Sequence, residues 1–347
     1  MDPVELAALL GLTELPAGLE AVEVELDRAV VVTRDEIEQP ARRVVLGGGK
    51  RLRPALALGC AAAATGRDGD AVVDPDVVLG ATAVELVQAG SLVHDDIMDE
   101  AGERRGVPTI NAKEGPSQAL LVGDFLLARA GQLAATVNQD VAGLLAAAIA
   151  DLCIGQSAEV ATLFDVDRSV SAYEDSIRGK TAALFRAACE IGAAAAEAPD
   201  GAVTALATYG TAFGMAFQVV DDVLDLVSTA EALGKPVGND IREGVYSLPV
   251  LLALRGPDGA ALEARLGHRP GEDEVAHALA LVRGSDGVAA ALDRAREFNA
   301  EAVAALSELP PGPARDGLAA LPDAYLDWVL DAKAPDLVAG AATAAGR

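Results

Sequence analysis

Apolar residues, mostly alanine and leucine, fill long segments of this chain, and proline and glycine separate these segments. Strong helix formers of this kind, with little β-branched alternation, favour helices over strands. The pattern predicts an opening helix from about residue 19 into the forties, kinked near Pro40. The glycine run at residues 47–49 ends this helix, and Pro54 lies near the start of the next one.

Further along, the same punctuation predicts a helix over residues 75–99, a loop over residues 104–108 and a helix over residues 202–226. The stretch between Pro116 and Pro199 contains no proline and has room for three long helices. Shorter pieces and two terminal helices follow. We find no linker or composition shift, so the pattern predicts one all-α domain over residues 1–347, with a frayed tail at residues 335–347.

The composition limits the partners of the chain. Its 347 residues carry a formal net charge of -26, and only 3% of them are aromatic. A nucleic acid requires excess Lys and Arg, so this charge argues against one. A phosphorylated small molecule needs only a few local cations and carboxylate-bound metal ions, and it stays compatible with the charge.

The cysteines and the N-terminus indicate the compartment. Cys60, Cys153 and Cys189 are an odd number, widely spaced in apolar segments, and we expect them to be buried thiols in a reducing compartment. The first residues lack a basic secretory n-region. Asp151 and Glu190 interrupt the most apolar stretches, so we expect no transmembrane segment and a cytoplasmic protein.

Two acidic clusters share the spacing DDxxD. The first is Asp95, Asp96 and Asp99, and the second is Asp221, Asp222 and Asp225. On a helix, residues four apart lie about 40° apart, so the outer carboxylates of each cluster share one face. Three carboxylates near a helix C-terminus repel each other unless a cation compensates, and oxygen-only ligands suit Mg²⁺. A solvated acidic face is the alternative, which the duplication disfavours.

Each cluster continues a stripe along its helix. Gln88 and Ser91 precede the first cluster at helical spacing, and Gly210, Gly214 and Gln218 precede the second. The small residues leave a gap beside the carboxylates, or they allow close helix packing. The pattern alone does not choose between these two interpretations.

Basic residues follow glycines or the first cluster. They are Lys50, Arg51 and Arg53 in GGGKRLRP, Arg104 and Arg105 in AGERRGVPT, Lys180 beside Thr181 in IRGKTAALF, and Lys235 in LGKPVGND. Arginine presents a planar fork of donors to phosphate oxygens, and lysine presents a point charge. We therefore expect a phosphate-binding rim, although each residue by itself is more typical of a surface charge.

Together these motifs resemble the trans-isoprenyl diphosphate synthases, or polyprenyl synthetases. The resemblance covers residues 46–254, with GGGKRLRP, ELVQAGSLVHDDIMDEAGERRGVPT, GDFLLARA, GKTAALF, FQVVDDVLD and GKPVGNDIREG in family order. It implies an all-α helical bundle around a central cavity, usually in a homodimer. It also implies a reaction between isopentenyl diphosphate and an allylic diphosphate, with Mg²⁺ as cofactor and three ions per active site.

The resemblance assigns roles to residues. Mg²⁺ would be held by Asp95, Asp99 and Asp221, with Asp96, Asp222 and Asp225 in support, directly or through water. The allylic diphosphate would contact Arg104, Lys180, Thr181, Gln218 and Lys235, and isopentenyl diphosphate would contact Lys50, Arg53, Gln88 and Arg105. Asp95, Asp99, Asp221, Lys180 and Lys235 are thus the predicted catalytic residues.

The sequence departs from the family pattern twice. Gln88 replaces a histidine that is frequent in the family, and its amide can imitate the hydrogen-bond donor. Val245, in EGVYSLP, replaces a lysine of the family and cannot pair with phosphate. We therefore expect a weaker contact with one diphosphate at this position.

The chemistry implied is ionisation of the allylic diphosphate, attack by isopentenyl diphosphate and loss of a proton. Gly90 and Ser91 are small at positions where family members with short products carry aromatics, so we expect an all-trans product of C20 or longer.

A terpene cyclase of the same fold is an alternative, although cyclases usually replace the second DDxxD by an Asn/Ser/Glu triad and line the cavity with aromatics. A non-catalytic partner subunit is another, although such subunits usually lose aspartates.

Overall fold

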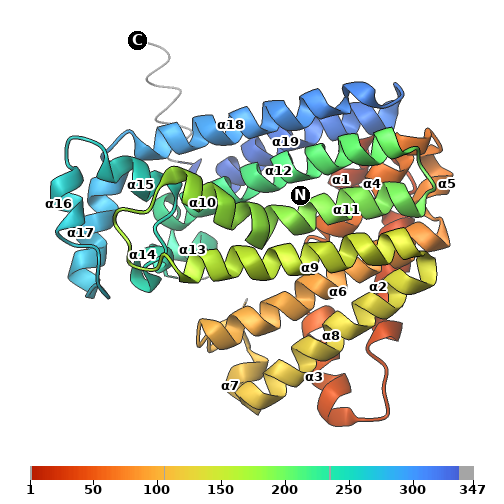
Figure 1. The fold of residues 1–347 in the computed structure, drawn as a ribbon, viewed down its shortest axis with the longest axis horizontal. Helices are drawn as coiled ribbons and strands as arrows, with labels where there is room; N and C mark the ends of the chain where they lie inside the picture. Colours follow the sequence, from red (N-terminus) through yellow and green to blue (C-terminus); the bar gives the residue numbers. More distant parts are fainter. Residues whose placement is uncertain (1, 105, 234–235, 336–347) are drawn as a thin grey trace. The chain divides into compact units, whose positions relative to one another are not determined.

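The computed structural model describes residues 2–104, 106–233 and 236–335. Its described residues form helices almost throughout, and the single pair of strands among them is a short hairpin (Figure 1). The predicted all-α fold class is therefore confirmed. The tail predicted to fray lies, apart from residue 335, outside the described residues.

The first half of the chain contains the helices on either side of the hairpin. They are α1 (Pro3–Leu10), α2 (Leu15–Ala29), α3 (Asp35–Val45), α4 (Leu52–Thr65), α5 (Asp68–Val72), α6 (Pro75–Met98), α7 (Ile110–Glu114), α8 (Pro116–Val137) and α9 (Gln139–Val160). Strand β1 (Glu103–Arg104) pairs antiparallel with β2 (Val107–Pro108).

The second half begins with α10 (Val170–Ile177), a π turn η1 (Arg178–Ala182) and α11 (Ala183–Ala195). It continues with α12 (Asp200–Val227), α13 (Ala230–Leu233), α14 (Asn239–Glu243), α15 (Leu248–Leu254), α16 (Gly259–Glu263), α17 (Glu272–Arg283), α18 (Gly287–Ala305), the 3₁₀ turn η2 (Leu306–Glu308) and α19 (Pro313–Lys333). Three long helical segments do fill the proline-free stretch, and the third contains the π turn.

The contacts divide the chain into two compact units that alternate along the sequence. The first unit comprises Met1–Ala150, Leu184–Gly210 and Val303–Leu321, and the second comprises Asp151–Ala183, Thr211–Ala302 and Pro322–Arg347. Each DDxxD cluster thus belongs to a different unit. The single domain predicted from the sequence stays a prediction.

The opening helix predicted from residue 19 into the forties is wrong in one respect. It is two helices, α2 and α3, separated by residues 30–34. A run of three valines and Thr33 lies at this break, and β-branched side chains lose rotamer freedom in a helix. Pro40, where we expected the kink, lies inside α3.

The core of the first unit forms around α4 and α6. Residues 54–64 of α4 are all buried, and α6 packs against α2, α4 and α8. At the crossing of α4 with α11, a side chain at Gly192 would lie 2.0 Å from the carbonyl oxygen of Ala57. The two backbones therefore touch, which fixes the position of α4 and of the basic segment before it.

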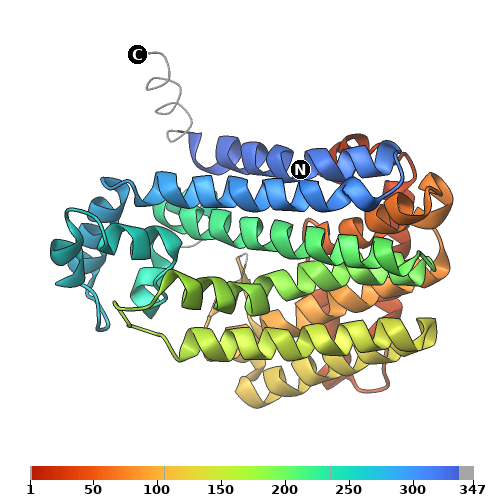
Figure 2. The same ribbon diagram turned by 45° about the horizontal axis from the view of Figure 1, so that its top comes forward.

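Aromatic side chains pack around Tyr325 in the core of the second unit. The ring of Tyr325 stacks on Phe217 at 5.3 Å and meets the edge of Phe213 at 6.0 Å between centroids. Figure 2 shows the short helices α15, α16 and α17 gathered together, in agreement with their mutual contacts. Helix α10 and the part of α12 that follows Gly210 also belong to this unit, and α12 carries the second acidic cluster.

Four helices of the described chain are long and apolar enough to cross a membrane by length and composition alone. Pairing α17 with the segment after it would raise the number to five. The apolar windows of α6 and α12 are 67% and 61% buried, whereas those of α8 and α9 are only 28% and 22% buried. The expectation of no transmembrane segment is thus not confirmed and stays a prediction.

The cysteine prediction is correct at two positions of three. Cys60 and Cys189 are buried, but Cys153 is exposed. The apolar segment around Cys153 belongs to α9, whose small residues form a surface face rather than core. Local composition therefore misled the assignment.

Candidate active site

The first DDxxD cluster lies at the C-terminal end of α6. The Asp74 side chain caps the start of this helix by accepting the Asp76 N–H, and Asp99 is its C-cap residue. Asp95 is half-buried, Asp96 is 6% exposed and Asp99 is exposed. The outer carboxylates are thus open to solvent where the helix dipole is negative, which favours a bound cation.

Asp96 is held by the hairpin. The Arg104 Nε–H of β1 donates to Asp96 Oδ1 at 2.8 Å. Burial raises the pKa of Asp96, and the charge of Arg104 and its hydrogen bond oppose this rise. Arg104 was predicted to bind the allylic diphosphate, and here it pairs with the middle carboxylate of the first cluster.

The basic segment before α4 is shaped by Arg51. Lys50 is exposed, and the Arg53 guanidinium lies 4.4 Å from the centre of the Phe185 ring. Arg51 between them adopts φ 46°, in the left-handed region, and its guanidinium donates to Glu23, Glu85 and the carbonyl oxygen of Val45. Because Arg51 points inward, it anchors the segment.

A cavity of about 90 Å³ adjoins the first cluster. Asp96 and Arg104 line it together with Gly47 and Gly48 of the glycine run. The first unit thus brings the glycine run and the first acidic cluster together. Arg43 also lines the cavity and pairs with Glu114 at 2.8 Å.

The residues preceding the first cluster lie along α6. Gln88 is half-buried, and Ser91 is buried with its hydroxyl donating to the Gln88 carbonyl oxygen at 3.0 Å. A side chain at Gly90 would lie 3.1 Å from the Gly123 carbonyl oxygen of α8 and 3.3 Å from Leu127. Gly90 therefore allows α6 and α8 to pack closely, and the role of Gly90 and Ser91 in product length stays a prediction.

The second DDxxD cluster lies near the C-terminal end of α12. Asp221 is exposed, whereas Asp222 and Asp225 are 5% and 2% exposed. The Asp240 N–H donates to Asp225 Oδ2 at 3.2 Å, and the Gly238 N–H donates to the Asp225 carbonyl oxygen at 2.8 Å. The backbone at Gly238 and Asp240 is thus attached to this cluster.

Asp222 is enclosed by hydrogen-bond donors. The Tyr173 hydroxyl donates to Oδ2 at 2.5 Å, and the Gln218 amide donates to Oδ1 at 2.7 Å. Burial raises the pKa of Asp222 to about 7, the two hydrogen bonds oppose the rise, and repulsion from Asp221 and Glu159 adds to it.

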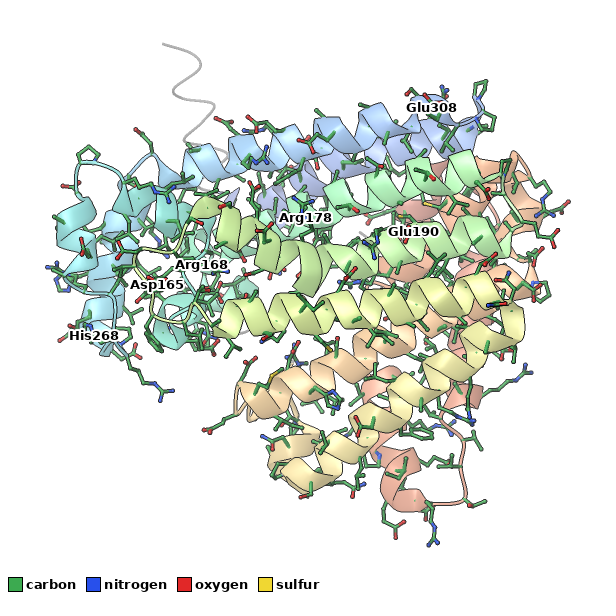
Figure 3. All side chains as sticks on the ribbon, viewed as in Figure 1. Asp165, Arg168, Arg178, Glu190, His268 and Glu308 are labelled. Carbon is green, nitrogen blue, oxygen red and sulfur yellow. The ribbon has the colours of Figure 1, made fainter. Side chains whose placement is uncertain are left out.

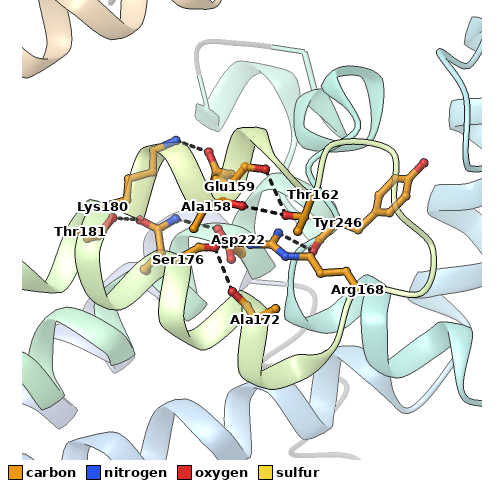
Figure 4. A network of polar contacts seen from close by, with 11 residues as sticks. Ala158, Glu159, Thr162, Arg168, Ala172, Ser176, Lys180, Thr181, Asp222 and Tyr246 are labelled. Atoms are coloured by element: carbon orange, nitrogen blue, oxygen red, sulfur yellow. Dashed lines mark hydrogen bonds and ion pairs between the residues drawn. The ribbon is translucent and has the colours of Figure 1, made fainter. Parts of the chain in front are cut away.

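The π turn η1 presents Lys180 and Thr181 to the same network (Figure 4). Lys180 pairs with Glu159 of α9, and the Thr181 hydroxyl donates to Gln218 Oε1 at 2.6 Å. A Cβ atom added at Gly155 would lie 2.1 Å from the backbone nitrogen of Lys180, so the backbone of α9 touches the turn directly. Inserted π turns are frequent at functional sites.

The second unit therefore brings Lys180, Thr181 and Gln218 together with the second cluster. Val245 is half-buried, and its N–H donates to the Asp240 carbonyl oxygen at 2.8 Å. Lys235 and Arg105 lie outside the described residues. The predicted roles of all these side chains stay predictions.

Sequence reasoning assigned no role to Glu159, Arg168 or Tyr173, although all three are buried in this network. Tyr173 carried a usable signal. It precedes Lys180 by seven residues, or two helical turns, which places the two on one face. Its partner Asp222 is 49 residues away, and no local pattern reveals that contact.

The donor set fits a hydrated, hard divalent cation. No group of three or more His, Cys, Asp or Glu side chains within the described part of the chain is arranged to hold a metal ion by itself. Mg²⁺ typically uses only one or two carboxylates and completes its shell with water and substrate phosphates. Asp95, Asp99 and Asp221 are the carboxylates of the two clusters that are not buried, and they suit this mode.

Known proteins are similar to this chain in sequence and in fold. A family model described as polyprenyl synthetase matches residues 34–282. The nonaprenyl diphosphate synthase of Mycobacterium tuberculosis is 37% identical over 310 residues, which cover 88% of this chain and 91% of that protein. Heptaprenyl diphosphate synthase component 2 of Geobacillus stearothermophilus is 36% identical over 302 residues, 87% of this chain and 92% of that protein.

Solved structures of polyprenyl synthases have the same fold as this chain. A polyprenyl synthase from Caulobacter crescentus, crystallised with calcium and isoprenyl diphosphate, has a TM-score of 0.84 and 33% identity, covering 92% of this chain and 96% of that chain. The helical fold, with one DDxxD cluster in each unit, is that of an all-α isoprenoid synthase. The chain belongs to the polyprenyl synthetase family, and the prediction of a prenyltransferase is confirmed.

Proposed function

We propose that this protein condenses isopentenyl diphosphate with an allylic diphosphate to make a linear all-trans polyprenyl diphosphate of C20 or longer. The observation that carries the proposal is the duplicated DDxxD cluster, set near a helix end in each unit with a cationic side chain beside it. Relatives named for nonaprenyl, octaprenyl and geranylgeranyl products support the chain length.

The proposed reaction needs no side-chain nucleophile. The C–O bond of the allylic diphosphate breaks, and diphosphate leaves with the electron pair. The double bond of isopentenyl diphosphate then forms the new C–C bond with the allylic carbon, and a proton is lost to restore a double bond. Preorganised positive charge around the leaving diphosphate lowers the barrier of the first step.

Mg²⁺ is the proposed cofactor, and when bound it would neutralise charge that develops on the leaving diphosphate. Asp95, Asp99 and Asp221 would hold it, and Asp96, Asp222 and Asp225 would support them. The calcium and isoprenyl diphosphate in the Caulobacter crescentus structure favour a divalent cation. The predicted number, three ions per active site, can be measured by metal titration in the presence of inorganic diphosphate.

The cationic side chains have proposed roles on each substrate. Arg104, Lys180 and Lys235, with Thr181 and Gln218, would bind the allylic diphosphate. Lys50, Arg53, Gln88 and Arg105 would bind isopentenyl diphosphate. Lys180 would exchange its ion pair with Glu159 for phosphate oxygens, because a compact ammonium group on a flexible stem can reorient.

The experiment is incubation of the pure protein with Mg²⁺, isopentenyl diphosphate and each allylic primer, followed by mass analysis of the product. Asp95→Ala or Asp221→Ala should slow turnover by ~10³-fold or more, because each lost metal contact removes several kcal/mol and ~1.4 kcal/mol is tenfold. Near-wild-type turnover of Asp95→Ala would overturn the metal assignment. A cyclic product without diphosphate would indicate a cyclase, and an inactive pure protein would indicate a partner subunit.

We also propose a homodimer formed through the exposed apolar faces of α8 and α9. On α8, Leu120 and Leu121 are 51% and 54% exposed. Exposed small residues continue this face at Ala128, Gly131 and Ala135 of α8, and at Gly143, Ala146, Ala147 and Ala150 of α9. Small side chains allow close helix approach, and an apolar face this long favours a second copy of the chain over water.

Leu121→Glu should dissociate the dimer, because the new carboxylate would lose its hydration in the interface. Light scattering after size exclusion measures the result. Val4→Glu, at a residue 68% exposed on α1, is the control that should leave the mass unchanged. A monomeric wild-type protein would contradict the dimer. We also propose a cytoplasmic location, which the buried free thiols of Cys60 and Cys189 support and which fractionation of cells expressing the protein would test.

A further inference from the structure

The middle carboxylate of each DDxxD cluster points into its own unit. Asp96 accepts from Arg104, and Asp222 accepts from Tyr173 and Gln218. Both are buried, whereas Asp95 and Asp221 are accessible. The tighter of the two arrangements is at Asp222, where both carboxylate oxygens already accept a hydrogen bond.

Tyr173 is built to hold this carboxylate. It lies on α10, it is 2% exposed, and Ser169 caps the start of its helix by accepting the Ala172 N–H. A fully buried carboxylate is costly unless donors satisfy it. The Tyr173 hydroxyl supplies a short donor from a rigid ring, so the position of Asp222 is coupled to α10.

The guanidinium of Arg168 packs against the ring of Tyr173. Figure 3 places Arg168 on the connection between α9 and α10, and the residue is 3% exposed. Its guanidinium lies 5.5 Å from the centre of the Tyr173 ring. It also donates to Ser176 at 2.8 Å and to the Tyr246 carbonyl oxygen at 3.3 Å (Figure 4). The buried positive charge thus lies against the ring that holds Asp222.

We infer that Tyr173, supported by Arg168, is a positioning residue of the second acidic cluster: it fixes Asp222 inward, so that the adjacent Asp221 is directed toward the metal. This inference rests on the proposed function of the cluster. It assigns Asp222 to internal support through hydrogen bonds rather than to direct coordination. Residues that hold metal ligands in this way typically contribute 10- to 100-fold to metal affinity or activity, so Tyr173→Phe should cost roughly that factor.

The test is calorimetric binding of inorganic diphosphate in the presence of Mg²⁺, without turnover. Tyr173→Phe removes only the hydroxyl and should weaken this binding by roughly 10- to 100-fold. Tyr209→Phe is the matched control, because Tyr209 is also fully buried and its hydroxyl donates to the Leu318 carbonyl oxygen in the first unit. Both variants should lower Tm, but only Tyr173→Phe should weaken Mg²⁺-dependent binding.

Asp222→Asn supplies a second variant that keeps the shape of the side chain. If Asp222 acts through Tyr173, the double variant Tyr173→Phe/Asp222→Asn should bind no more weakly than the worse single variant. Equal binding by Tyr173→Phe and Tyr209→Phe would overturn the inference, as would full additivity in the double variant. If the wild-type protein itself failed to bind diphosphate with Mg²⁺, the proposed function and the inference would both be overturned.

Discussion

Replacing Arg51 by Met tests whether the basic segment before α4 depends on a buried ion pair. The Arg51 side chain is 10% exposed, and its partners Glu85 and Glu23 are 11% and 42% exposed. Arg51 Nη1 donates to Glu85 at 2.7 Å, and Nη2 donates to the Val45 carbonyl oxygen at 2.7 Å. Met keeps an unbranched apolar stem that ends near the position of Arg Nε, so the change removes the guanidinium, its charge and its hydrogen bonds.

The cost follows from the burial of Glu85. Removing one partner of a buried pair leaves an uncompensated charge and typically costs 3–5 kcal/mol. Glu23 stays hydrated and adds little, so we expect Arg51→Met to lower the free energy of unfolding by about 3 kcal/mol. Because Lys50 and Arg53 flank the lost anchor, KM for isopentenyl diphosphate should also rise, with a smaller effect on kcat.

Urea unfolding at pH 7 measures the first effect, and initial rates at varied isopentenyl diphosphate measure the second. Arg28→Met is the control, because the Arg28 side chain is 70% exposed and its pair with Glu25 should contribute less than 1 kcal/mol. Adding Glu85→Gln to Arg51→Met should restore most of the stability by removing the stranded charge. A loss below 1 kcal/mol for Arg51→Met, or no rescue by Glu85→Gln, would refute the reasoning.

Three further predictions address product length, the missing lysine and pH. Ser91→Phe should shorten the product and leave the first condensation largely intact, and an unchanged product mass distribution would contradict this account of length control. Val245→Lys should lower KM for one diphosphate substrate by restoring a cation; unchanged KM for both substrates would show that this position does not contact them. The pKa of Asp222 is raised to about 7, above its unfolded value near 3.9, so its contribution to stability is present at low pH and lost as pH rises from about 4 to about 7. Without divalent cations, wild type should lose about 2 kcal/mol more than Asp222→Asn between pH 5 and 7 in urea unfolding, and parallel profiles would exclude this cause.

The sequence by itself determined the helical class and the spacing of the carboxylates within each cluster. DDxxD spacing places the outer carboxylates on one helix face wherever the helix lies, because helical periodicity is local. Proline and glycine similarly set the start of α6 and the approximate limits of α12. These features depend only on neighbouring residues, so they could be predicted before the fold was known.

The local sequence pattern did not predict the structure correctly where two interpretations fitted the same residues. The glycines before the second cluster could leave a gap or allow close packing, and a side chain at Gly210 would lie 2.7 Å from the Phe185 carbonyl oxygen, which favours packing there. The break between α2 and α3 occurs at β-branched residues rather than at Pro40. Cys153 lies on an exposed apolar face that has the composition of core.

Only the tertiary structure decided which carboxylates face solvent and which are held inside. Asp222 meets Tyr173 across 49 residues, and Arg51 meets Glu85 across 34. Burial and hydrogen-bond partners come from segments far apart in the chain, and they determine whether a carboxylate is accessible to solvent or enclosed by donors of the protein. The same DDxxD letters therefore occupy two environments, because the desolvation cost and the donors differ from one aspartate to the next.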